Sequence, residues 1–272
     1  MRLINRTAEA QERGRTVVAG IPIKSPRELE YMRQAGQVVA AVLGLLERSV
    51  EPGMRTRDLD TLVRQEIRRL GAKPAFLGYK GFPATICVSI NNEIVHGIPG
   101  DRVVRKGDLV SLDAGAIVSG FYADGAITVG VGSIGREERA LIDVTREALE
   151  RAVALCRDGV RIGDLGHAVQ SLAEGRGYSV VREYVGHGVG RALHEEPSIP
   201  NFGTPGMGVT LRKGMVIAIE PMVNLGGWRT ALMDDDWTVV TADGSLSAHF
   251  EHTVAIGEDG AEVLTRLNGE GR

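Results

Sequence analysis

The chain has 272 residues, of which 43% are hydrophobic and 25% charged, a composition typical of a globular protein with a substantial core. A disordered or fibrous chain is excluded, and the net charge of −3 gives no reason to expect nucleic acid or an anionic membrane as a partner. Two distant cysteines, Cys87 and Cys156, indicate neither a disulfide framework nor a zinc finger. The longest apolar run, 38–46, is too short to cross a bilayer. We therefore expect a soluble, cytoplasmic protein.

The first elements are an arm and two helices. Residues 1–24 are polar without a sustained period, and we expect them to form an extended N-terminal arm. A helix should then begin at Ser25, because this N-cap residue is followed by a proline in the first turn and by Glu28 three residues after the cap. The helix should end before Pro52, and a second helix is predicted at about 56–70.

The second half of the chain repeats the first. After a strand-rich stretch to about residue 130, we expect helices at about 137–157 and 164–173, and then strands from 178 to 264. Residues 53–59 parallel 159–165 at an offset of 106, and residues 105–113 parallel 212–220 at an offset of 107. Two copies of an αα-then-β unit, at about 25–130 and 131–265, can bury one continuous core. This favours an α+β fold over a parallel doubly wound sheet.

Two repeated strands are expected to stop on a carboxylate, Asp113 in the first copy and Glu220 in the second. A buried strand has no reason to end on a charge unless a metal cation or a base compensates for the lost solvation. Asp113 and Asp124 also flank a predicted hairpin turn at 118–120, and a two-residue turn would place both carboxylates on one face, nearly opposite each other. Carboxylates this close require a metal ion or a shared proton.

Three more candidate ligands lie in the second half. His187 lies in a glycine-rich turn, and Glu220 and Glu251 border apolar strands. Together with the two aspartates they form an oxygen-rich set with a single imidazole. Such a set suits Mn, Fe, Co or Zn in a two-metal site better than a thiol-rich zinc site.

Two further histidines, His96 and His194, each lie three residues before a proline, as if they held equivalent positions in the two halves. One interpretation is that they are turn histidines that cap backbone groups. The other is that they lie at the rim of the metal site, where they would donate hydrogen bonds to a carbonyl oxygen or a tetrahedral intermediate, or shuttle a proton.

Six motifs in this order carry a family resemblance. They are Asn91–Pro99, Leu112–Gly115 with Ala123–Asp124, Gly186–Gly190, His194–Pro197, Ile219–Pro221 and Phe250–Thr253. Together they resemble a type I methionine aminopeptidase, a metallopeptidase of family M24, over about residues 25–265. The resemblance implies the pita-bread fold, with two pseudo-symmetric αβ halves around a central antiparallel sheet, in a single catalytic domain over residues 25–272.

The resemblance also implies an activity. The enzyme would remove the N-terminal (initiator) methionine from nascent proteins, preferring a small second residue, by dinuclear-metal-activated water attack on the first peptide bond. The implied cofactors are two divalent metal ions per subunit, Co, Mn, Fe or Zn. Nascent-chain N-termini would be the partners, and the enzyme is expected to be a monomer that binds neither nucleic acid nor membrane. Association with the ribosome is a hypothesis that rests only on where the initiator methionine emerges.

Site residues follow from the same resemblance. The implied metal ligands are Asp113, Asp124, His187, Glu220 and Glu251. Glu220 would also take and return the proton, His194 would stabilise the oxyanion, and His96 would hydrogen-bond the amide nitrogen side of the scissile bond. The implied methionine pocket consists of Tyr79, Phe82, Cys87 and Trp237, with Phe76 and Leu193 as neighbours, and His96 and His194 also contact the substrate.

Three positions depart from the family pattern. Lys80 stands where a histidine is common, Leu193 stands where an aromatic residue is frequent, and His249 lies two residues before Glu251. Strand alternation predicts that His249 shares a face with Glu251 and supports a metal ligand. These departures would affect the shape of the methionine pocket and the properties of the metal site.

Two alternative functions remain at this stage. A Xaa-Pro aminopeptidase would share the five ligands but resembles a chain with a large N-terminal domain, whereas only about 24 residues precede the first helix here. A non-catalytic pita-bread binding protein would be expected to have lost ligands, and all five are present.

Overall fold

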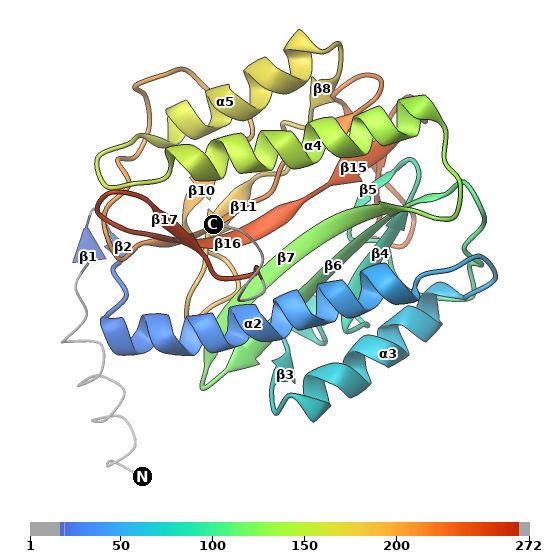
Figure 1. The fold of residues 1–272 in the computed structure, drawn as a ribbon, viewed down its shortest axis with the longest axis horizontal. Helices are drawn as coiled ribbons and strands as arrows, with labels where there is room; N and C mark the ends of the chain where they lie inside the picture. The colour runs from blue at the N-terminus through green and yellow to red at the C-terminus, as the bar shows by residue number, and fades with distance from the viewer. Residues whose placement is uncertain (1–16, 19, 267–272) are drawn as a thin grey trace.

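The computed structural model describes residues 17–18 and 20–266. Within them, four α-helices form where the sequence predicts helices (Figure 1). These are α2 (Pro26–Ser49), α3 (Thr56–Arg69), α4 (Arg136–Leu155) and α5 (Ile162–Gly175). The predicted start of α2 is confirmed, because the Ser25 side chain accepts from the Glu28 backbone N–H and the Glu28 carboxylate accepts from the Ser25 backbone N–H. No helix in these residues is long and apolar enough to cross a membrane.

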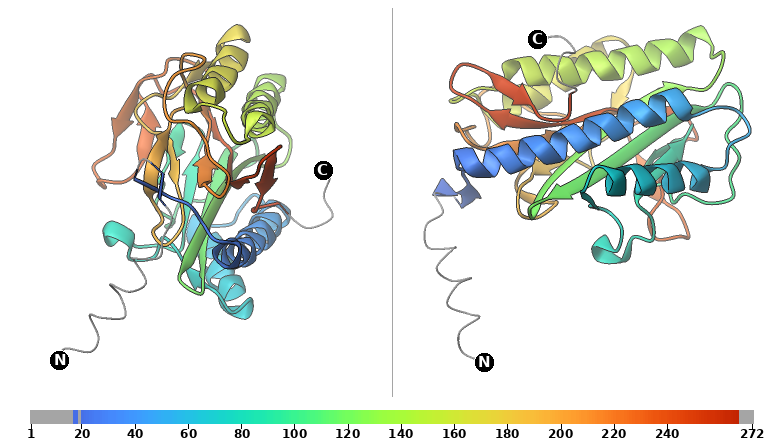
Figure 2. Two further views of the ribbon diagram at one scale, coloured as in Figure 1. Left: turned by 90° about the vertical axis from the view of Figure 1, so that its left-hand side faces the viewer. Right: turned by 60° about the horizontal axis from the view of Figure 1, so that its bottom comes forward.

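A nine-stranded antiparallel sheet forms the centre of the described fold. Its strands are β3 (Lys73–Pro74), β4 (Ile86–Ile90), β6 (Leu109–Val118), β7 (Phe121–Gly130), β9 (Gly186–Gly188), β10 (Glu195–Ile199), β11 (Val216–Ile219), β16 (Glu251–Ile256) and β17 (Ala261–Val263). They run in the order β10-β9-β11-β16-β7-β6-β3, with β17 paired to β16 and β4 paired to β6. Helices α2 and α4 lie on the same side of this sheet (Figures 1 and 2).

Three smaller sheets complete the described strands. They contain β1 (Val17–Val18) with β2 (Ile21–Pro22), β15 (Ser247–His249) with β12 (Met222–Asn224) and β8 (Ser179–Val180), and β13 (Thr230–Leu232) with β14 (Val239–Thr241) and β5 (Glu93–Val95). A short 3₁₀ helix, η1 (Tyr79–Gly81), lies between β3 and β4. The predicted arm, residues 1–24, falls mostly outside the described residues, so the domain boundary at 24 stays a prediction.

The second helix of each αα unit begins with the same contacts. Arg55 forms an isolated antiparallel bridge with Val103 before α3, and Arg161 forms one with Thr210 before α5. Each arginine backbone N–H also donates to an aspartate three residues later, at the start of the helix. The corresponding positions differ by 106 and 107 residues, the offsets at which the sequence repeats.

The β6–β7 hairpin decides which side of the sheet carries the acids. Its turn, Ser119 and Gly120, has positive φ at both residues (51° and 80°), as a two-residue type I′ turn requires. The prediction that Asp113 and Asp124 share a face is confirmed, but they are diagonal rather than opposed, because Asp113 pairs with Ala126 and Asp124 pairs with Gly115.

Alternation along β6 separates the core from the acids. Its even-numbered residues Val110 to Ala116 pack in the apolar cluster beneath α2 and α3, so its odd-numbered residues face the other side. The expectation that the first repeated strand stops at Asp113 is wrong. The strand continues to Val118 because β7 pairs with it along its whole length, which leaves Asp113 in the middle of the strand.

Candidate metal centre and substrate pocket

The predicted metal ligands come from five strands that lie next to one another. Along the sheet order β9-β11-β16-β7-β6, each strand, or for β11 the residue directly after it, contributes one candidate ligand. In that order the residues are His187, Glu220 (directly after β11), Glu251, Asp124 and Asp113. All five line one cavity. The sheet therefore gathers side chains that are up to 138 residues apart in the chain.

The ligand atoms lie close together and are buried. One ligand atom from each of Asp124, His187 and Glu251 lies within 4.8 Å of the others. His187 Nε2 is 3.4 Å from Asp124 Oδ2 and 3.7 Å from Glu220 Oε1. Among the described residues, the buried Asp113 Oδ1 has no hydrogen-bond partner. An unpartnered buried carboxylate oxygen beside three other carboxylates fits a site built for a cation.

Neighbouring backbone and side chains orient two of these ligands. His187 Nδ1 lies 2.9 Å from the Gly188 carbonyl oxygen, which can only accept, so Nδ1 carries the proton and Nε2 is left to bind a metal. Thr253 Oγ1 donates to Asp124, whose Oδ1 lies 3.0 Å away. Thr253 is two residues after Glu251 and shares its strand face, so strand alternation could have identified it in advance.

Burial and mutual repulsion perturb the acids. Burial, followed by repulsion from Asp124, raises the pKa of Asp113 and of Glu251 well above the usual range. Burial raises the pKa of Glu220 to about 8, although His187 opposes the rise. Burial alone would lower the pKa of His187, but Asp124 and Glu220 outweigh it and raise this pKa to about 9. A divalent cation supplies the positive charge that such a cluster of carboxylates favours.

The two predicted rim histidines both line the cavity. His194 Nδ1 lies 2.8 Å from the Tyr79 hydroxyl, and the His194 ring centroid is 4.2 Å from that of His187. Burial and the neighbouring His187 lower the pKa of His194 to about 4, and burial lowers the pKa of His96. Both imidazoles are therefore neutral near pH 7, and a neutral imidazole carries one N–H donor.

The predicted methionine pocket lies beside the acids. An apolar cluster lines the same cavity and contains Tyr79, Phe82, Cys87 and Trp237 together with Phe76 and Leu193. The Phe82 and Trp237 rings meet edge to face, with centroids 5.0 Å apart. Burial raises the pKa of the Cys87 thiol, so it is uncharged. Aromatic rings and a neutral thiol form a suitable pocket for an apolar, sulfur-containing side chain.

Residues 30–258 match the profile of metallopeptidase family M24. The chain belongs to this family. This M24 metallopeptidase is 50% identical over 246 residues to the methionine aminopeptidase of Clostridium acetobutylicum, a match that covers 90% of this chain and 98% of the relative. It is 48% identical over 244 residues to methionine aminopeptidase 1 of Bacillus subtilis, which covers 90% and 98%.

A solved structure confirms the predicted fold. The M24 metallopeptidase superposes on the crystal structure of methionine aminopeptidase from Thermotoga maritima with a TM-score of 0.89 at 50% sequence identity, covering 90% of this chain and 99% of that one. The α+β fold is therefore the pita-bread fold that the resemblance implies.

His249 of the M24 metallopeptidase is placed differently from the prediction. Phe250 separates β15 from β16, so His249 and Glu251 belong to different sheets and do not share one alternating strand. His249 Nε2 lies 4.0 Å from Glu220 Oε2, too far for a hydrogen bond, and has no hydrogen-bond partner among the described residues. Burial, followed by the nearby His96, lowers the pKa of His249 to about 3, so this imidazole is neutral.

Two lysines escaped the sequence-based assignment. Lys80, noted only as a departure, lines the cavity, with its ammonium 5.4 Å from the Tyr79 ring centroid. Lys24, from the segment before α2, pairs with Glu195, the residue after His194. No local pattern marks this pair, because its members are 171 residues apart.

Proposed function

We propose that this M24 metallopeptidase removes the N-terminal methionine from peptide chains, and that it prefers a small second residue. The observation that carries the proposal is the position of the apolar pocket directly beside the acid cluster in one cavity. A methionine side chain in that pocket places its own carbonyl group next to the acids. The high identity to methionine aminopeptidases over almost their whole length supports the same activity.

Two divalent ions are proposed to occupy the site, with Mn, Co, Fe and Zn as candidates. Asp113, Asp124, His187, Glu220 and Glu251 would hold them, because four carboxylates and one imidazole suit these ions. Bound ions of this kind polarise a carbonyl and lower the pKa of water to about 7. The four carboxylates and His187 lie on the sheet face opposite α2 and α3, and the apolar cluster beneath those helices contains none of them.

Glu220 moves the proton in the proposed reaction. Its carboxylate is buried at the cavity and lies 3.7 Å from His187 through Oε1. From this position it can accept a proton from the attacking water and return it to the leaving amine. Because the strand β11 ends directly before Glu220, the carboxylate is held by the sheet rather than by a long loop.

His194 stabilises the oxyanion in the proposed reaction. When the Tyr79 hydroxyl donates to His194 Nδ1, the ring carries its proton on Nε2, which is then the donor toward the substrate. The hydrogen bond from a preorganised neutral donor of this kind becomes stronger as the carbonyl oxygen becomes charged. His96, which lines the same cavity, would hydrogen-bond the amide nitrogen side of the scissile bond. Nascent-chain N-termini are the proposed substrates, and ribosome association and a monomeric state stay predictions.

The activity can be tested with a tripeptide. The protein, stripped of metal and then reconstituted with Mn, Co, Fe or Zn, should release free methionine from Met-Ala-Ser in a metal-dependent manner. A Gly-Pro-containing peptide should be spared, because a Xaa-Pro aminopeptidase is the alternative that shares the five ligands. Cleavage of the proline peptide in preference to Met-Ala-Ser, or no methionine release with any metal, would contradict the proposal.

Metal binding itself should raise thermal stability. At a metal concentration about 100 times Kd, binding stabilises the folded state by about 2.7 kcal/mol, which corresponds to a rise in Tm of roughly 5–10 °C for a domain of this size. Differential scanning fluorimetry with and without metal measures the shift.

Asp113→Asn should reduce the shift in Tm, because it removes one proposed ligand. Asp143→Asn, at an exposed position on α4, is the matched control and should retain the full shift. Equal shifts in both variants would show that Asp113 is not a ligand.

A further inference from the structure

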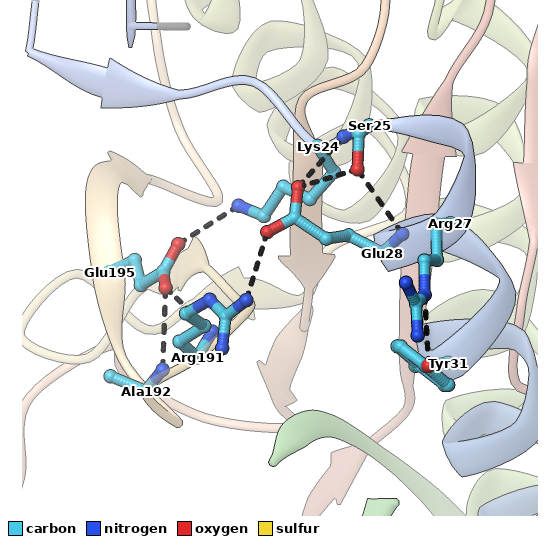
Figure 3. Close-up of polar contacts among 8 residues, drawn as sticks. All are labelled: Lys24, Ser25, Arg27, Glu28, Tyr31, Arg191, Ala192 and Glu195. Carbon is cyan, nitrogen blue, oxygen red and sulfur yellow. Dashed lines mark hydrogen bonds and ion pairs between the residues drawn. The ribbon is translucent and has the colours of Figure 1, made fainter. Parts of the chain in front are cut away.

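A buried ion pair joins the segment before helix α2 to the loop that carries His194 (Figure 3). Lys24 Nζ lies 2.9 Å from Glu195 Oε2, and the two side chains are only 1% and 10% exposed. Burial would raise the pKa of Glu195, but the Lys24 ammonium and backbone N–H donors outweigh it and hold this pKa below its usual range. The Glu195 carboxylate is therefore charged near pH 7.

The same carboxylate also closes the loop. Glu195 Oε1 accepts from the backbone N–H of Arg191 at 2.8 Å and from that of Ala192 at 3.3 Å. The ion pair packs directly on Gly190, where an added Cβ would lie 2.7 Å from both Lys24 Cε and Glu195 Oε1. Any side chain at 190 would therefore displace the pair, so this glycine is required for close packing.

A second, exposed contact runs parallel to the buried pair (Figure 3). Arg191 Nη2 lies 3.3 Å from Glu28 Oε1, in the capping box at the start of α2. Because the Arg191 side chain is 48% exposed, solvent screens this contact and it contributes little energy. The buried Lys24–Glu195 pair is the stronger constraint on where the loop lies.

Glu195 connects this constraint to the histidines in the cavity. It directly follows His194, which lines the cavity and meets the Tyr79 hydroxyl at 2.8 Å. Glu195 also opens β10 and pairs there with Gly188 of β9, next to His187. A shift of the Glu195 backbone would therefore move His194 directly and disturb the strand that carries His187.

We propose that Lys24 and Glu195 are positioning residues for His194. The ion pair fixes the loop against the segment before α2 and so holds the His194 imidazole where it stabilises the oxyanion. A buried pair adds little net stability compared with apolar side chains, but it restricts geometry. A misplacement of about 1 Å can cost about 100-fold in rate. The inference rests on the proposed function, because it concerns the oxyanion of that reaction.

The test is a kinetic comparison on the metal-loaded enzyme with Met-Ala-Ser. Lys24→Met should lower kcat between about tenfold and 100-fold and leave KM within about twofold, because the imidazole acts in the transition state. Arg33→Met, on α2, removes an exposed ion pair with Glu262 and should leave kcat unchanged. A kcat for Lys24→Met within about twofold of wild type would overturn the proposal.

A double-variant cycle separates positioning from general destabilisation. In a His194→Ala background, Lys24→Met should cause no further loss of kcat, because the group that it positions is already gone. A loss of the same size in both backgrounds would overturn the proposal. If Lys24→Met does not fold, Glu195→Gln takes its place, since the amide oxygen can still accept from Arg191 and Ala192. Wild-type enzyme that releases no methionine would instead reject the proposed function, and this inference with it.

Discussion

Glu220→Gln should lower kcat for methionine release from Met-Ala-Ser by about 10²–10⁴-fold, the range that a positioned general acid–base contributes. Glutamine has nearly the same shape but cannot take the proton from water, and Glu220 lies buried at the cavity with Oε1 3.7 Å from His187. Steady-state kinetics at saturating metal measure the change, and no rescue is expected at higher substrate concentration.

Because Glu220 is also a proposed ligand, the metal content of the variant must be measured beside its activity. Glu258→Gln is the control, since this carboxylate is exposed and pairs with Lys213 at the surface. A variant that keeps its metal and retains kcat within about tenfold of wild type would show that another group moves the proton.

His194→Ala should lower kcat by about 10²–10³-fold, the loss that follows removal of one oxyanion donor. KM should change little, because the donor acts mainly as charge develops on the carbonyl oxygen. Tyr79→Phe should produce a smaller loss of about tenfold, since it removes the hydroxyl 2.8 Å from His194 Nδ1 that selects the tautomer, but leaves the imidazole in place.

The two variants should not be additive, because Tyr79 acts on the oxyanion through His194. Tyr178→Phe is a suitable control, since Tyr178 packs in the apolar cluster with α4 and α5 rather than in the cavity. If the losses of the two single variants multiply in the Tyr79→Phe/His194→Ala double variant, the Tyr79 hydroxyl acts on the substrate independently of His194.

Most of the structural elements could be predicted from local patterns in the sequence. The capping box at Ser25 and Glu28 specifies where α2 begins. The two-residue turn at Ser119 and Gly120 fixes which residues of β6 and β7 pair, and this register puts Asp113 and Asp124 on one face. These features depend on residues within a few positions of one another, so they can be read without knowledge of the rest of the chain.

Two predictions failed where pairing between distant segments decides the outcome. Asp113 was expected at a strand end, but β7 pairs along all of β6 and carries the strand five residues further. His249 was expected to share a strand face with Glu251, but the chain passes from one sheet to another at Phe250. A strand's length and sheet membership depend on its partners, and alternation within a single strand does not contain that information.

The sequence by itself determined the four helices, the shared face of the two aspartates and the chemical character of the ligand set, because short-range periodicity and residue chemistry carry them. Only the tertiary structure decided the strand order that gathers the ligands and the pairing of Lys24 with Glu195. With 32 basic and 35 acidic residues in the chain, nothing local selects this pair from the others. The selection is made by the packing of the loop against the start of α2, which exists only in the folded protein.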